Sequence, residues 1–326
     1  MNNNEITEAL YNISTTSKRH TFYKNWIDND NGQLNNEVFS SIECTDDLHY
    51  SMISTAKRFK DLHPDKQPIV MYSGGIDSEA VLKSFIDAKI RVKAVHFKWS
   101  HKGLNNTLDL QHVKEFHNKY YKDFDLEVID FEITEEMVNR CRQEKWWNIP
   151  NMWIGLGNLV ISIAFHNYAT QQDTDIPLIT GYGTVASVIF ERVYGDCCTA
   201  YIRPRAVRAI VDGKFPYYSF YAQFPYIFKT VVNLYKNNNL MQMYRKYPHF
   251  KFDFANMFGL PLRTNSNGTD FIMHPIEISE DSPEKRYHKN DLWLYFTGTD
   301  GRSLTTNKMK NTSAIVLDTF KSNILT

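Results

Sequence analysis

Residues 73–78 combine the residue types of this chain that are best suited to binding a phosphate group. Two adjacent glycines can adopt positive φ without a Cβ penalty, so consecutive backbone N–H groups can curve around an anion. A carboxylate beside a polyphosphate repels it unless a divalent cation lies between them or the carboxylate caps a helix. Asp77 therefore favours a magnesium nucleotide over a bare phosphate. The candidate ligand-binding residues of this 73–78 loop are Ser73, Gly74, Gly75, Ile76, Asp77 and Ser78.

The segments on either side predict a strand before the 73–78 loop and a helix after it. Residues 68–72 form a short apolar run that is typical of a strand. Apolar residues then recur with helical spacing at Ala80, Val81, Leu82 and Phe85. The first amides of a helix have no acceptor within the helix and lie at the positive end of its dipole. A strand, tight loop and helix in this order predict an anion-binding junction.

This junction resembles the PP-loop family of nucleotide α-hydrolases, or ATP pyrophosphatases, whose motif Ser-Gly-Gly-x-Asp-Ser follows the first strand of the core. Asparagine synthetase, through its synthase domain, is the nearest member in character. The resemblance implies that the 73–78 loop binds ATP, that Asp77 is a catalytic residue and ligates Mg²⁺, and that ATP is split between its α and β phosphates. A Walker A loop is excluded here because no Gly-Lys-Ser/Thr closes the glycine stretch.

Further strand and helix patterns alternate along the chain after the loop. Residues 91–97, 126–131 and 176–180 have the composition of strands, and residues 109–121 and 153–169 have that of helices. This alternation predicts an α/β fold, with a parallel sheet covered by helices on both faces. The resemblance narrows the expected fold to the HUP/PP-loop type. Ligands of such sheets bind beyond the carboxyl ends of the strands.

The end of the second predicted strand supplies a further group of candidate residues. In PP-loop proteins the backbone of this strand lies along the adenine edge, so the resemblance places His96, Phe97 and Lys98 near the base. An alternative for His96 is a histidine that belongs to the core. Lys98 and Lys102 are candidates to stabilise the charge that develops during phosphoryl transfer.

A glycine-bearing loop follows the fourth predicted strand at Gly181, Tyr182 and Gly183. Alone, the pattern Gly-x-Gly-x-x-Ala matches a dinucleotide-binding fingerprint. PP-loop enzymes also place a glycine-bearing loop here, against the ATP phosphates, and that interpretation brings both motifs into one site. Asparagine synthetase has Gly-Glu-Gly-Ala-Asp-Glu in this loop. The acidic members are missing from this chain unless Glu191 or Asp196 supplies them.

Three arginines stand close together around Pro204, at Arg203, Arg205 and Arg208. Guanidinium groups bind phosphate or carboxylate in a bidentate manner, which makes Arg203 and Arg205 candidate catalytic residues. A solvated helix face is the alternative interpretation of this cluster.

Composition limits the classes of partner. The chain has 326 residues, with 37 Lys and Arg against 37 Asp and Glu. Its net charge therefore favours neither nucleic acid nor an anionic membrane as a partner. A local basic patch is still compatible with this balance. Its four cysteines form neither a disulfide framework nor a Cys-x-x-Cys metal pair. The polar start and the lack of an apolar run of about 18 residues predict a cytoplasmic protein without a membrane span.

Three segments are expected from these patterns: an N-terminal helical extension at 1–65, a nucleotide-binding core at 66–200, and a C-terminal substrate or partner region at 201–326. The first segment is too short for the glutaminase domain that asparagine synthetase carries. The third is rich in loops and in aromatic residues, most of which we expect to be core. They crowd together at Tyr217, Tyr218, Phe220, Tyr221, Phe224, Tyr226 and Phe228.

The resemblance implies an ATP-dependent enzyme that forms AMP and pyrophosphate while it activates an oxygen of the substrate for attack by ammonia, an amine or another nucleophile. Its partners would be ATP, Mg²⁺ and a small-molecule or nucleic-acid-base substrate. One alternative is a nucleotide-binding module that recognises a protein or nucleic acid without turnover. A PAPS-reductase-like or sulfur-transfer enzyme is a further alternative, but it needs a reactive cysteine near the carboxyl end, and none follows Cys198.

Overall fold

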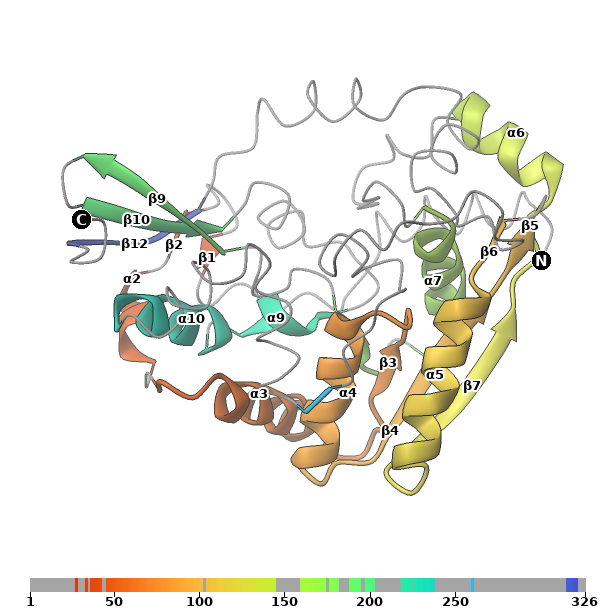
Figure 1. The fold of residues 1–326 in the computed structure, drawn as a ribbon, viewed down its shortest axis with the longest axis horizontal. Coiled ribbons are helices and arrows are strands. Elements are labelled where there is room, and N and C mark those ends of the chain that lie inside the picture. Colours follow the sequence, from red (N-terminus) through yellow and green to blue (C-terminus); the bar gives the residue numbers. More distant parts are fainter. Residues whose placement is uncertain are drawn as a thin grey trace, which may run out of the picture.

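The described residues form a five-stranded, all-parallel sheet, of which β3, β4 and β7 can be followed in Figure 1. Its strands are β3 (Ile69–Met71), β4 (Val92–Lys98), β7 (Phe124–Asp130), β8 (Leu178–Thr180) and β11 (Tyr218–Ser219). The computed structural model describes residues 27–28, 33–34, 36–42, 45–101, 104–144, 159–173, 176–181, 188–194, 197–202, 218–224, 226–237, 259–260 and 315–321.

The order of the strands across the sheet is β11-β8-β3-β4-β7. The chain therefore enters the sheet at its middle strand, β3, and runs outward through β4 and β7. It then crosses back to form β8 on the other side of β3, with β11 at that edge. Val70 is level with Ala94 of β4 and with Ile179 of β8. The neighbours β3 and β8 thus form a topological switch point, where open α/β sheets leave a crevice beyond their carboxyl ends.

Helices cover both faces of the sheet, which confirms the α/β prediction. The helices of the described residues are α2 (Asn36–Ser41), α3 (Leu48–Leu62), α4 (Ile76–Asp87), α5 (Thr107–Tyr120), α6 (Glu135–Glu144), α7 (Leu159–Gln171), α9 (Phe220–Gln223) and α10 (Tyr226–Lys236), of which α4, α5 and α7 pack directly on the sheet. Val70 packs with α4 and α5 on one face, and the next residue, Met71, packs with α7 on the other. This alternation follows from the two-residue period of a strand.

A second helical layer, formed by α3 and α10, lies outside α4. α3 begins at Leu48 because the Asp47 carboxylate caps it, accepting a hydrogen bond of 3.0 Å from the Tyr50 amide. The Phe59 ring of α3 lies 5.8 Å from that of Phe220 and 5.2 Å from that of Phe224. The buried aromatics of residues 218–228 therefore belong to the core, as the sequence predicts.

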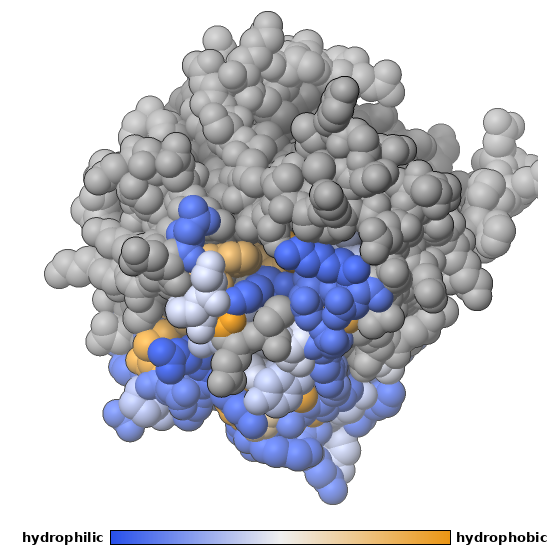
Figure 2. Space-filling model, turned by 90° about the vertical axis from the view of Figure 1, so that its left-hand side faces the viewer, coloured by the Kyte–Doolittle hydropathy of each residue, from blue (hydrophilic) through white to orange (hydrophobic). Residues whose placement is uncertain are grey.

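Burial of these aromatic rings leaves a polar exterior. On the side of the molecule that Figure 2 shows, the described surface is mostly hydrophilic, and hydrophobic residues appear only as small patches. In the part of the chain that the structure describes, no helix is long and apolar enough to cross a membrane.

Some elements differ from the sequence predictions. The sequence predicts one helix at 221–235. The structure has two, α9 and α10, separated at Phe224, whose extended backbone (φ −127°, ψ 142°) precedes Pro225. Proline disfavours the helical conformation of the residue before it, which explains the break. The polar loop predicted at 99–107 contains a small antiparallel pair, β5 (Ser100–His101) and β6 (Leu104–Asn105).

The sequence analysis missed an antiparallel hairpin after the fourth core strand. It is formed by β9 (Val188–Tyr194) and β10 (Cys197–Ile202), and β12 (Ile315–Lys321) pairs with the free side of β10. Its signal is present in the sequence, because two apolar runs are separated by the dipeptide Gly-Asp, which is typical of a two-residue hairpin turn. Another two-stranded pair is β1 (Ile27–Asp28) with β2 (Gln33–Leu34).

Elements from all three predicted segments contribute to the core. α3 comes from residues before 65, and β11 and α10 come from residues after 200, yet all three pack with α4 in one hydrophobic cluster. The sequence also predicts a helix at 240–247, a turn at 252–258 and a strand at 291–296. These segments and the first part of the helix predicted at 153–169 lie outside the described residues.

Candidate functional site

The 73–78 loop connects β3 to α4 with the predicted strand, tight turn and helix. Gly74 adopts φ +87°, a conformation in which a Cβ is strained, whereas Gly75 is extended (φ −83°, ψ 156°) and forms the N-cap of α4. The amides of Ser78 and Glu79 both donate to the Gly75 carbonyl, at 3.1 Å each. Of the two glycines, only Gly74 uses the positive φ for which the sequence motif is suited.

Side-chain hydroxyl groups stabilise the turn internally. The Ser78 hydroxyl donates to the Gly75 carbonyl at 2.8 Å, and the Ser73 hydroxyl oxygen accepts from the Gly75 amide at 3.3 Å. The two hydroxyl oxygens lie 3.2 Å apart. Because a hydroxyl has one proton, Ser78 donates to a phosphate only by releasing Gly75. These hydrogen bonds close the loop around its own backbone.

Gly74 lies directly against the start of α5. A Cβ placed on Gly74 would come within 2.9 Å of both the Cβ and the carbonyl oxygen of Asp109. Asp109 stands in the first turn of α5 and is buried. The sequence analysis treated Asp109 only as the start of a helix and missed its place beside the loop. The signal available was its position in the first helical turn after β4, on the same rim as the loop.

Gly181, immediately after β8, lies against the first turn of α4. A Cβ on Gly181 would lie 3.0 Å from the Ser78 amide nitrogen and 3.1 Å from the Asp77 carbonyl carbon. The structure thus brings together the ends of β3 and β8 at the topological switch point. Tyr182 and Gly183 lie outside the described residues, so Gly181 is the residue of the second glycine motif that the structure describes.

The three candidates at the end of β4 have different surroundings. The His96 side chain is fully buried, and its Nδ1 lies 2.9 Å from the Tyr72 carbonyl oxygen. Phe97 faces the opposite side of the sheet, where its ring lies 5.4 Å from that of Phe165 of α7. Lys98 is half exposed and forms an ion pair of 2.9 Å with Asp130. The His96 imidazole thus occupies a core position, so a contact with a base at this strand end would use backbone atoms.

Burial lowers the pKa of His96, and the hydrogen bond to the Tyr72 carbonyl opposes this effect only in part. The neutral ring then donates its Nδ1–H to the Tyr72 carbonyl, since a carbonyl can only accept. His96 therefore holds the backbone at the residue that precedes Ser73.

A buried polar network under the loop extends this support. The Tyr72 hydroxyl donates to the carboxylate of Glu79 in α4, and both side chains are fully buried. Asn106, the N-cap of α5, donates to the Phe97 carbonyl at 2.7 Å and accepts from the Trp99 amide at 2.9 Å. These bonds join β3, β4, α4 and the start of α5. Tyr72, Glu79 and Asn106 were missed by the sequence analysis because their roles depend on contacts between elements.

Asp77 is half-buried at the second position of α4. Among the described residues, no group of three or more His, Cys, Asp or Glu side chains is arranged to hold a metal ion. A single carboxylate such as that of Asp77 fits Mg²⁺ bound to a nucleotide, because Mg²⁺ commonly takes one or two protein carboxylates and completes its octahedron with phosphate oxygens and water. Asp77 is the carboxylate of the 73–78 loop.

The remaining sequence candidates are placed only in part. Lys102, Arg203, Arg205, Arg208 and Asp196 lie outside the described residues. Glu191 belongs to β9 in the three-stranded antiparallel sheet. The described site therefore consists of the 73–78 loop, Asp109, Gly181 and the network beneath them.

A scan against models of known protein families finds no match to this chain, and a search of curated proteins finds no significantly similar sequence. The local geometry therefore carries the functional argument.

Proposed function

We propose that the chain binds magnesium ATP at the 73–78 loop and splits it into AMP and pyrophosphate to activate an oxygen of a second substrate. One observation carries this proposal: the Ser-Gly-Gly-x-Asp-Ser motif and Gly181 lie against each other beyond the carboxyl ends of β3 and β8. This is the switch point at which open α/β sheets bind ligands. The strand order and the motif together support a HUP/PP-loop type of fold.

The proposed roles of the residues follow from their positions. The N-terminal end of α4 would place the positive end of the helix dipole near the phosphates, while the amides of Ser78 and Glu79 donate to Gly75. The absence of a Cβ lets Gly74 pack against Asp109 and lets Gly181 pack against the peptide between Asp77 and Ser78. Asp77 would hold Mg²⁺, which neutralises charge on the phosphate oxygens. A substrate oxygen then attacks the α phosphorus, the bond to the bridging oxygen breaks, and pyrophosphate leaves.

Such a transfer requires little covalent chemistry from the protein, because alignment and charge stabilisation supply most of the rate. Lys98 is half exposed and paired with Asp130, so it would have to leave this ion pair to reach a phosphate. Arg203 and Arg205 stay candidates from their sequence pattern. The substrate class we propose is a small molecule or nucleic-acid base with a carboxylate or amide oxygen.

The direct test is a screen for AMP and pyrophosphate release from ATP in the presence of carboxylates, amides and bases, each with ammonia or an amine. Stimulated, equimolar release of both products with one class of acceptor would support the proposal. ADP and phosphate as products would contradict it, because cleavage would then fall between the β and γ phosphates. Binding of ATP without magnesium dependence would contradict the role of Asp77.

A second candidate function is a nucleotide-binding module without turnover. Two features favour it: acidic residues are missing at 181–187, and the Ser78 hydroxyl is bound to Gly75 within the closed loop. Calorimetry with ATP and with a non-hydrolysable analogue, run beside the product screen, separates the two. Tight binding of both nucleotides with no AMP from any acceptor would select the binding module.

A further inference from the structure

Tyr221 of α9 contacts the backbone of the 73–78 loop from a distant part of the chain. Its hydroxyl donates a hydrogen bond of 2.8 Å to the carbonyl oxygen of Asp77, across 144 residues of sequence. The Tyr221 side chain is completely buried, and its ring packs edge-on against Phe220 at 5.7 Å. The ring is thus held by the core, and only its hydroxyl reaches the loop.

The same peptide group is contacted from a second side. A Cβ on Gly181 would lie 3.2 Å from the Asp77 carbonyl oxygen and 3.0 Å from the Ser78 nitrogen. Gly181 follows β8, and Tyr221 follows β11, which pairs with β8 through Ser219 and Thr180. The half of the sheet beyond the switch point therefore confines the peptide between Asp77 and Ser78.

The acceptor fixes the direction of this hydrogen bond. A carbonyl oxygen can only accept, so the Tyr221 hydroxyl is the donor.

We infer that Tyr221 is a positioning residue of the nucleotide site, because its hydroxyl fixes the peptide that carries Asp77 and so sets the direction of the Asp77 carboxylate and of the Ser78 amide. This inference rests on the proposed function. It predicts that a residue in the aromatic segment of the chain controls magnesium-dependent nucleotide affinity without touching the nucleotide.

The test compares Tyr221→Phe with a matched control, Thr230→Val. Both variants delete one buried hydroxyl while keeping the shape of the side chain. Thr230 of α10 lies 2.6 Å from the hydroxyl of Ser51 in α3, which belongs to the outer helical layer. Two readouts are used: backbone hydrogen exchange over residues 76–79 in the free protein, and the Kd for ATP with and without Mg²⁺.

We expect Tyr221→Phe to exchange faster at residues 76–79 and to bind magnesium ATP about tenfold more weakly, as for the loss of one well-placed hydrogen bond. Thr230→Val should change neither readout. Unchanged exchange in Tyr221→Phe would overturn the inference. Faster exchange with unchanged affinity would also overturn it, since Tyr221 would then be only structural. Wild-type protein that binds no ATP would overturn the proposed function itself, and with it a nucleotide role for Tyr221, whatever the exchange shows.

Discussion

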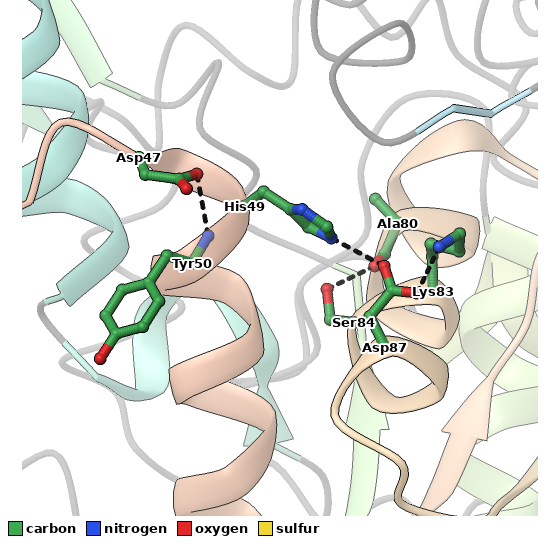
Figure 3. Close-up of polar contacts among 7 residues, drawn as sticks. All are labelled: Asp47, His49, Tyr50, Ala80, Lys83, Ser84 and Asp87. Carbon is green, nitrogen blue, oxygen red and sulfur yellow. Dashed lines mark hydrogen bonds and ion pairs between the residues drawn. The ribbon is translucent and has the colours of Figure 1, made fainter.

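The two ends of α4 are held in place by different kinds of interaction. At its N-terminal end, glycines without side chains meet Asp109 and the Asp77 peptide, and buried groups bind backbone carbonyls. At its C-terminal end, Asp87 forms an ion pair with Lys83 one turn earlier and lies 2.7 Å from Nε2 of His49 in α3 (Figure 3). The N-terminal end is held by contacts with its backbone, and the C-terminal end is held to α3 by charged side chains.

This difference suggests separate purposes for the two ends. A partly exposed ion pair contributes about 1 kcal/mol or less and tolerates small shifts of its side chains. Backbone contacts at 3 Å tolerate little movement, because protein interiors are close-packed. The N-terminal end is therefore the part of α4 where geometry matters most, and the C-terminal end is ordinary helix-to-helix attachment. Four substitutions test this contrast, apart from the experiment on Tyr221.

Replacing Gly74 with Ala should have the largest effect. The new Cβ would be strained at φ +87° and would overlap Asp109 at 2.9 Å, which together should destabilise the fold by roughly 2–5 kcal/mol and abolish nucleotide binding. Gly259→Ala is the matched control, since Gly259 also has positive φ (+60°) but has nothing within 4 Å of a Cβ. Urea unfolding of both variants measures the difference. Equal losses would show that contact with Asp109 is unimportant.

Asp77→Asn should leave the fold intact while it removes the charge proposed to hold magnesium. We expect pyrophosphate release to fall about 100-fold or more, with a small change in Tm. The matching control is Asp125→Asn, which removes an exposed carboxylate outside the site and should leave pyrophosphate release unchanged. A variant at Asp77 that keeps full magnesium-dependent turnover would remove this carboxylate from the mechanism and would weaken the contrast between the two ends.

His96→Gln tests the support beneath the N-terminal end through pH. Burial lowers the pKa of His96 in the folded state, so the unfolded chain binds more protons below its pKa of about 6.5. In the wild type, the stabilisation by His96 is complete above about pH 6.5 and is lost as the pH falls toward the pKa of His96 in the folded state. The glutamine of the variant does not titrate, so the variant does not lose stability in this way as the pH falls. The stability gap between wild type and variant should therefore narrow from pH 7.5 to pH 5, as measured by urea unfolding; a constant gap would contradict a neutral, buried His96.

Asp87→Asn should have the smallest effect, at the other end of the helix. Burial raises the pKa of Asp87, but hydrogen bonds from Lys83 and His49 outweigh burial and lower it. Its stabilisation is therefore complete above the unfolded pKa of about 3.9 and is lost as the pH falls through the folded value. We expect the variant to lose about 0.5–1 kcal/mol at pH 7, and this loss should shrink as the pH falls below about 3.9.

Asp125→Asn is the control for this pair, because Asp125 binds Arg91 at 2.6 Å but both side chains are at least half exposed. It should change stability by less than Asp87→Asn at pH 7. A larger loss from Asp125 would show that the partial burial of Asp87 contributes nothing.

Local patterns in the sequence predicted most of the elements near the loop. The run at 68–72 and the helical spacing from Ala80 to Phe85 predict β3 and α4, because burial on one face imposes a short period on the sequence. The break at Phe224 and the hairpin of β9 and β10 also have local signals in the sequence, a proline and a Gly-Asp pair.

What the sequence alone determined is the 73–78 loop, with its donors and its carboxylate, because neighbouring residues define it. Only the tertiary structure decided that His96 belongs to the core, that Asp109 and Gly181 flank the loop, and that Tyr221 binds the Asp77 carbonyl. These contacts join residues far apart in the chain, and their geometry depends on which strand lies beside β3. The periodicity of the local sequence does not encode the neighbour of β3, because packing between distant elements determines it.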